Sequence, residues 1–186
     1  MMRIITGSAR GVRLQTLPGE DTTRPTTERV KESVFSALQF ETEGRDVLDL
    51  FAGSGQMGLE AMSRGARSCT FVDSSREACE IVKQNARATK LQKNIQVLNT
   101  AAEAFCERRE GTFDMVFLDP PYRAGLLPTI LPMLPALMRE GGVAVCETDL
   151  TTVLPETVTD GERRLVCEKQ KRYGKTLVWF YRAETT

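Results

Sequence analysis

Short apolar runs alternate with stretches of helical periodicity through the middle of the chain. Five such runs, at residues 46–51, 69–73, 95–99, 115–119 and 143–147, are almost continuously apolar. This pattern is typical of strands that are buried on both faces of a parallel sheet. The stretches between them carry helical patterns, one of which starts with the capping sequence Ser74-Ser75-Arg76-Glu77. The alternation predicts a parallel, doubly wound α/β sheet.

Two of the helical stretches contain unusual residues. The apolar stripe of the helix that follows Ser74 is interrupted by only two polar residues, Asn85 and Thr89. The segment 126–138 holds three prolines where a crossover helix is needed. Pro128 suits the first turn of a helix. Pro132 or Pro135 should then break that helix or begin a second short one.

The two ends of the chain read as hairpins. Residues 3–6 and 12–14 flank Gly7 and Gly11, and a helix capped by Thr26 or Thr27 follows. Near the other end, residues 165–168 and 176–181 read as strands without a helix between them, so they must pair antiparallel. We expect one domain, 1–186: an N-terminal hairpin arm at 1–25 and a Rossmann-like core at 26–186, with a mostly parallel, seven-stranded sheet and an antiparallel C-terminal strand.

Composition narrows the chemistry. The 186 residues include no histidine, which excludes His-dependent triads and most zinc sites. Five scattered cysteines without a C-x-x-C pair suit a reduced cytoplasm, and no apolar run is long enough for a membrane span. Net charge is zero, yet residues 1–18 and 163–175 are basic. These basic ends predict either a nucleic-acid surface or ordinary solvated charge.

A glycine-rich loop follows the first predicted strand of the core. Gly53, Gly55 and Gly58 have the G-x-G-x-x-G spacing, and Asp73 ends the next strand, where an acid can hold the hydroxyls of a ribose. NAD and S-adenosylmethionine (SAM) both fit this pattern, and a tight turn without a ligand is a third interpretation. Asp49 favours SAM, because a buried acid would repel a pyrophosphate but could help bind the ammonium of a methionine moiety.

The fourth predicted strand ends in the sequence VFLDPPYR, residues 116–123. Asp119 offers a carboxylate, the Pro120 carbonyl offers an acceptor, Pro121 removes a backbone donor and Tyr122 offers an aromatic face. Two acceptors that grip an exocyclic amine favour a pyramidal nitrogen able to attack a methyl group, while the ring stacks on an extruded base. Such catalysis depends on positioning and requires neither a metal nor a histidine.

These motifs resemble the RsmD family, which methylates the N2 amine of one guanine in 16S ribosomal RNA. The matching segments are RIITGSARGVRL (3–14), RPTTERVKESVF (24–35), VLDLFAGSGQMGLEAMSRGA (47–66) and LDPPYRAGLL (118–127). The resemblance implies a class I SAM-dependent methyltransferase. It implies a SAM site made of Asp49, Phe51, Ala52, Gly53, Ser54, Gly55, Asp73, Ser74, Ala101, Ala102 and Asp119. It implies a guanine site made of Asp119, Pro120, Pro121 and Tyr122.

The resemblance also implies a partner, 16S rRNA, alone or within a small ribosomal subunit. The expected RNA contacts are Arg3, Arg10, Arg13, Arg24, Arg123, Lys171 and Arg172. We expect a cytoplasmic monomer with no metal. One departure concerns the segment 99–103, where many methyltransferases place an acid against the adenine; here we expect backbone groups near Ala101 and Ala102 to do this, and Glu103 to begin a helix. An adenine-N6 methyltransferase, a silent RNA-binding protein and a dehydrogenase are the alternatives.

Overall fold

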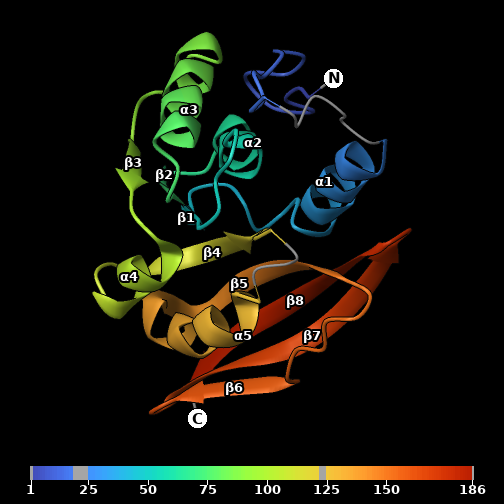
Figure 1. The fold of residues 1–186 in the computed structure, drawn as a ribbon, viewed down its shortest axis with the longest axis vertical. Helices are drawn as coiled ribbons and strands as arrows, with labels where there is room; N and C mark the ends of the chain where they lie inside the picture. Colours follow the sequence, from blue (N-terminus) through green and yellow to red (C-terminus); the bar gives the residue numbers. More distant parts are fainter. Residues whose placement is uncertain (1, 19–24, 122–124, 186) are drawn as a thin grey trace.

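The computed structural model describes residues 2–18, 25–121 and 125–185. Its strands form one eight-stranded sheet in the order β3-β2-β1-β4-β5-β8-β7-β6 (Figure 1). Five strands form its parallel half: β1 (Asp46–Asp49), β2 (Ser68–Asp73), β3 (Ile95–Asn99), β4 (Phe113–Leu118) and β5 (Met138–Asp149). Their carboxyl ends therefore lie along one edge, with β1 and β4 adjacent at its centre.

Three antiparallel strands complete the sheet: β6 (Thr157–Asp160), β7 (Arg163–Tyr173) and β8 (Thr176–Thr185). Strand β8 inserts between β5 and β7, so the predicted fold class and C-terminal hairpin are confirmed. The sheet has eight strands instead of the seven expected. The extra strand, β6, has only four residues and buries only Val158, which is too little apolar pattern to announce a strand.

Helices cover both faces of the sheet and divide the core in two (Figure 1). One face packs against α4 (Ala102–Glu107), α5 (Leu127–Ile130) and the 3-10 helix η2 (Leu131–Leu137). The other packs against α1 (Pro25–Ala37), α2 (Gln56–Ser63), α3 (Arg76–Ala88) and the N-terminal arm. Successive residues of a strand alternate between the faces, as Val47 and Leu48 do, because side chains have a period of two.

Local chemistry sets several helix boundaries. Ser75 is the N-cap of α3, and its hydroxyl accepts from Ala78 N at 3.2 Å, so the helix begins one residue later than a cap at Ser74 implies. The proline-rich segment breaks as expected: Pro128 lies in the first turn of α5, and η2 takes over at Leu131. Pro132 lies in the first turn of η2, where a proline is tolerated, and Pro135 lies inside this short helix, where it would interrupt an α-helix.

Gly58 lets α2 lie directly on β2. A methyl group at this position would lie 2.3 Å from a ring carbon of Phe71 and 2.7 Å from the sulfur of Cys69. No real side chain makes contacts so short, so α2 would have to move away from the sheet. The third glycine of the loop therefore serves helix–strand packing.

The N-terminal arm, residues 2–18, forms the expected hairpin, with a bridge between Arg3 and Arg13. It is held by the carboxylate of Glu60 on α2, which accepts from Ile5 N at 2.8 Å and Thr6 N at 3.0 Å. Lys31 Nζ lies 3.6 Å from Glu60 and donates to Arg3 O at 2.6 Å, while Arg64 donates to Glu60 at 2.8 Å. We call this group the arm anchor: Glu60, Lys31 and Arg64 with the backbone of residues 3–6.

Among the described residues, no helix is both long enough and apolar enough to cross a bilayer.

Candidate active site

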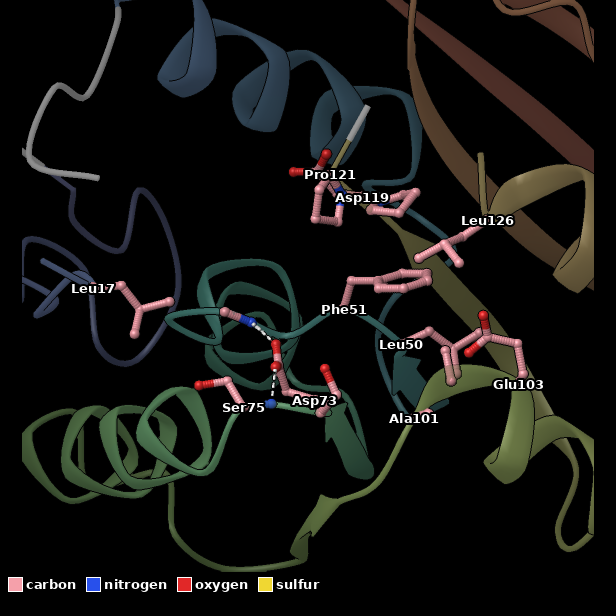
Figure 2. Close-up of a pocket in the computed structure, with 14 residues that line it drawn as sticks. Leu17, Leu50, Phe51, Asp73, Ser75, Ala101, Glu103, Asp119, Pro121 and Leu126 are labelled. Carbon is pink, nitrogen blue, oxygen red and sulfur yellow. Dashed lines mark hydrogen bonds between the residues drawn. The ribbon is translucent and has the colours of Figure 1, made fainter. Parts of the chain in front are cut away.

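A cavity of about 570 Å³ opens at the carboxyl ends of the parallel strands. This is the place where open α/β sheets bind ligands, and the volume is in the range of small-molecule sites. Its walls come from the loops after β1, β2, β3 and β4 and from the arm (Figure 2). The lining residues are Leu17, Leu50, Phe51, Gly53, Asp73, Ser74, Ser75, Ala101, Ala102, Glu103, Asp119, Pro120, Pro121 and Leu126.

The glycine-rich loop takes a conformation that requires glycine. Gly53 has φ of 52° and Gly55 has φ of 78°, both in the left-handed region that side chains with a Cβ disfavour. Gly55 is the N-cap of α2, so the turn leads directly from β1 into the helix. A Cβ on Gly53 would meet nothing within 4 Å, whereas one on Gly55 would press on Val82 at 3.2 Å. Gly53 therefore faces open space and Gly55 faces α3.

Asp73 fixes the floor of the cavity. One carboxylate oxygen accepts from Gly53 N at 2.9 Å and the other from Ser75 N at 2.8 Å, as the dashed lines of Figure 2 show. Each carboxylate oxygen has two lone pairs, so both can accept a further hydrogen bond. The carboxylate thus joins the loop after β1 to the loop after β2 while keeping acceptor capacity toward the cavity.

Asp49 lies behind the loop and is only 4% exposed. Its carboxylate accepts from Gly58 N at 3.0 Å, at the start of α2. Burial raises the pKa of Asp49 to about 7; the Gly58 hydrogen bond opposes this rise, and the charge of Asp73 adds to it. Asp49 is not among the residues that line the cavity.

The cavity is acidic. Asp73, Glu103 and Asp119 line it, and within the described part of the chain no lysine or arginine does. A pyrophosphate carries negative charge and would be repelled here, since like charges in a partly desolvated site repel strongly. A ligand with positive charge and ribose hydroxyls suits the same walls. This observation separates the two candidate ligands, which the glycine spacing alone cannot do.

The end of β4 forms the upper wall of the cavity in Figure 2, where Asp119 and Pro121 lie on the far side of the Phe51 ring from Asp73. Asp119 and Pro121 are exposed, whereas Pro120 is buried. Strand β4 pairs with β1 up to Phe117 beside Asp49, which brings the Asp-Pro-Pro segment next to the glycine-rich loop. Tyr122 and Arg123 lie outside the described residues.

A family model described as "Conserved hypothetical protein 95" matches residues 2–182 of the chain. Over 186 residues the chain is 41% identical to "Putative rRNA methyltransferase YlbH" of Bacillus subtilis (strain 168), covering 97% of this chain and 98% of that protein. Over 133 residues it is 38% identical to "Ribosomal RNA small subunit methyltransferase D" of Escherichia coli (strain K12), covering 72% of this chain and 66% of that protein.

The chain belongs to the RsmD family. The resemblance read from the four sequence segments is confirmed. A solved structure described as "Putative methyltransferase yhhF from Escherichia coli" superimposes with a TM-score of 0.85 at 29% identity, covering 100% of this chain and 99% of that one. The class I methyltransferase fold is confirmed with it.

The structure gathers most of the predicted SAM residues of this RsmD-family chain around one cavity. Phe51, Gly53, Asp73, Ser74, Ala101, Ala102 and Asp119 line it; Asp49, Ala52, Ser54 and Gly55 do not. The Ser54 hydroxyl donates instead to Met2 Sδ at 3.1 Å. Ser54 and Ala52 are buried, so their side chains belong to the packing behind the loop.

Five lining residues were not assigned to the site from the sequence: Leu17, Leu50, Ser75, Glu103 and Leu126. Leu50 and Ser75 lie next to assigned residues at the ends of β1 and β2, so strand-end position could have found them. Glu103 is in the first turn of α4, as expected for a helix start, but also lines the cavity. Leu17 and Leu126 reach the cavity only through tertiary packing, which no local pattern announces.

The predicted RNA contacts flank α1. Arg10 and Arg13 are exposed on the arm, and Arg3 is exposed but paired with Glu28 at 2.9 Å. At the tip of the β7–β8 hairpin, Arg172 is exposed and Lys171 is half-buried. The hydroxyl groups of Ser33 on α1 and Tyr173 at the tip hydrogen-bond each other, so the tip packs against α1. Arg24 lies outside the described residues.

Proposed function

We propose that this RsmD-family protein transfers a methyl group from SAM to the exocyclic N2 amine of a guanine in 16S rRNA. It is an rRNA methyltransferase by family. The observation that carries the finer proposal is the meeting of an acidic cavity with the Asp-Pro-Pro segment at the adjacent ends of β1 and β4. We also propose a cytoplasmic, monomeric protein of one domain that acts on rRNA, naked or within the small ribosomal subunit.

The acidic lining of the cavity suits the positive charge of SAM, and its volume of about 570 Å³ suits a small molecule. Asp73 would bind the ribose hydroxyls with its remaining lone pairs, and Gly53 would allow close approach of the backbone to the ligand. Ala101 and Ala102 at the start of α4 would border the adenine, and Asp49 would help bind the methionine ammonium, directly or through water. When bound, SAM supplies an electrophilic methyl group on a positively charged sulfur.

The Asp-Pro-Pro segment would hold the amine. The Asp119 carboxylate and the Pro120 carbonyl would each accept a hydrogen bond from one N–H of the amine. Pro121 has no backbone N–H that could compete for these acceptors. The nitrogen lone pair is then free to form the new bond as the carbon–sulfur bond breaks, and the surplus proton leaves through the Asp119 carboxylate to solvent. Tyr122 would stack on the guanine. Positioning and charge therefore account for the catalysis.

RNA would reach the site across α1, between the arm and the hairpin tip. In Figure 1, β4 points toward α1, and the arm and the β7–β8 tip lie on either side of that helix. Arg10, Arg13 and Arg172 are exposed there and would contact phosphates, as would Arg3, Arg24, Arg123 and Lys171.

The test is Asp119→Ala, assayed on rRNA from a strain that lacks the protein. We expect turnover to fall roughly 100-fold or more, because an amine acceptor at the reacting centre is lost. Binding of the product S-adenosylhomocysteine (SAH), measured by calorimetry, should change little. Glu110→Ala, an exposed acid in the loop before β4, is the matched control and should retain wild-type turnover.

Mass analysis of the methylated nucleosides identifies the product. N2-methylguanosine in small-subunit rRNA would support the proposal. N6-methyladenosine would overturn it in favour of an adenine-N6 methyltransferase. Unchanged turnover of Asp119→Ala would rule out the proposed grip on the amine.

A further inference from the structure

Asn85 is a buried amide in the largely apolar stripe of α3, only 1% exposed. Its Oδ1 accepts from Gln15 N at 2.8 Å, and its Nδ2 donates to Gln15 O at 3.0 Å. One side chain thus satisfies both backbone groups of one arm residue, as a neighbouring strand would. The second Nδ2 hydrogen donates to Ser54 O at 2.8 Å, in the glycine-rich loop.

Asn85 therefore joins three separate segments: α3, the arm and the loop after β1. A second link runs the same way, because Ser54 Oγ donates to Met2 Sδ at 3.1 Å and Met2 O accepts from Leu14 N at 3.0 Å. Packing of α3 alone does not need an amide, since a buried polar group costs free energy unless it is fully hydrogen-bonded. The three hydrogen bonds of the amide to the arm and to the glycine-rich loop explain its presence.

What it holds includes a wall of the cavity. Leu17 lies two residues after Gln15 and lines the cavity. Figure 2 places Leu17 at one end, Ala101 and Glu103 at the other, and Asp73 between them. With the ribose on Asp73 and the adenine near Ala101, the end covered by Leu17 is where the methionine part of the donor would lie.

We propose that Asn85 is a positioning residue that seats the N-terminal arm on the glycine-rich loop, so that Leu17 closes the methionine end of the donor pocket. This inference rests on the proposed use of SAM. It makes the arm part of the donor site in addition to its proposed contact with RNA. Removing the wall should weaken ligands that carry the amino-acid part and spare those that lack it.

The test compares two ligands by calorimetry: SAH, which has the homocysteine part, and 5′-methylthioadenosine, which lacks it. Leu17→Ala should bind SAH about five- to tenfold more weakly, because apolar contact with the ligand is lost. Its affinity for methylthioadenosine should stay within about twofold of wild type. Gln15→Ala is the matched control, since Asn85 hydrogen-bonds to the backbone of that exposed residue, and both affinities should stay at wild-type values.

Asn85→Ala removes the seat itself and should reproduce the ligand selectivity of Leu17→Ala at least as strongly. If that variant does not fold, Leu17→Ala still decides whether the arm closes the methionine end of the pocket, and the failure to fold assigns Asn85 to the stability of the fold instead. Equal losses for both ligands, or no loss for either, would overturn the inference while leaving the proposed function standing. A wild-type protein that binds neither ligand would overturn the proposed function and this inference with it.

Discussion

Among the described residues, two acids are almost completely buried, and they are satisfied in opposite ways. Glu60, 0% exposed, is held by Lys31, by Arg64 and by two backbone N–H groups of the arm. Asp49, 4% exposed, accepts from Gly58 N, and among the described residues no lysine or arginine pairs with it. Both contact α2: Glu60 lies within the helix, and Asp49, at the end of β1, accepts from Gly58 N in its first turn.

The two acids differ in how their charge is balanced. The charge of Glu60 is neutralised inside the protein, and burial beside it lowers the pKa of Lys31. Burial raises the pKa of Asp49 to about 7, because the Gly58 hydrogen bond offsets only part of the cost of burial and no lysine or arginine of the described residues pairs with the carboxylate. Glu60 is paired with cations of the protein at the arm anchor. Asp49 has no such partner among the described residues behind the glycine-rich loop, where a positively charged donor is proposed to bind.

The largest loss of stability should come from removing the charge of Glu60 in the arm anchor. Glu60→Gln leaves Lys31 buried, 2% exposed, without its counter-charge, which should cost about 3–5 kcal/mol of the free energy of unfolding in urea titrations. The control is Glu80→Gln, which removes an exposed pair with Lys83 on α3 and should cost about 0.5 kcal/mol or less. Similar losses in the two variants would show that the arm anchor is not a buried ionic centre.

Asp49→Asn tests the unpaired acid through the pH dependence of stability. Between pH 4 and 7 the folded wild type keeps a proton on Asp49 that the unfolded chain has released, so its stability falls as pH rises. The fall due to this group should be about 1 kcal/mol per pH unit between pH 5 and 7, or about 2 kcal/mol in all. The variant should lack it, as measured by urea unfolding at each pH.

Other acids do not obscure this comparison. Those with a lowered pKa, such as Asp46 hydrogen-bonded to Arg67, stabilise the fold above about pH 4 and lose that effect only on further acidification. Identical pH profiles for wild type and Asp49→Asn between pH 5 and 7 would show that Asp49 is ionised in the folded protein without a ligand.

The smallest effect concerns the uncharged part of the arm contact. Ser63 Oγ accepts from Ala9 N at 3.0 Å and donates to Thr6 O at 2.6 Å, so Ser63→Ala should cost about 1–2 kcal/mol of unfolding free energy. Ser54→Ala removes only a bond to the weak sulfur acceptor of Met2 and should cost about 0.5 kcal/mol. A larger loss of unfolding free energy in Ser54→Ala than in Ser63→Ala would show that the contact at Met2 stabilises the arm more than the contacts of Ser63 do.

The sequence predicted the parallel half of the fold well, because strands buried on both faces leave continuous apolar runs. It missed β6, whose four residues bury only Val158, and it started β5 late, at Val143, because Gly141 and Gly142 look like a turn. Strand β5 nevertheless starts at Met138, with an irregular register against β4 between Phe113 and Met115.

For the site, the sequence located the loops at the strand ends, since Gly53, Asp73 and Asp119 sit at fixed places relative to buried strands. It did not locate Leu17, whose position depends on how the arm docks, nor the role of Glu60, which reads as an ordinary helix residue. Asn85 was visible only as a polar residue in an apolar stripe. Its partners, 31 and 70 residues away, are set by tertiary structure.

The insertion of β8 between β5 and β7 has a practical consequence for labelling. Strand β8 starts at Thr176, beside Asp149 at the cavity edge of the sheet, and runs antiparallel to β5. Its last residues therefore emerge at the opposite edge, far from the end of β4 (Figure 1). A dye or surface tether attached after Thr185 would leave the mouth of the cavity clear, whereas one attached near Met2 would sit on the glycine-rich loop.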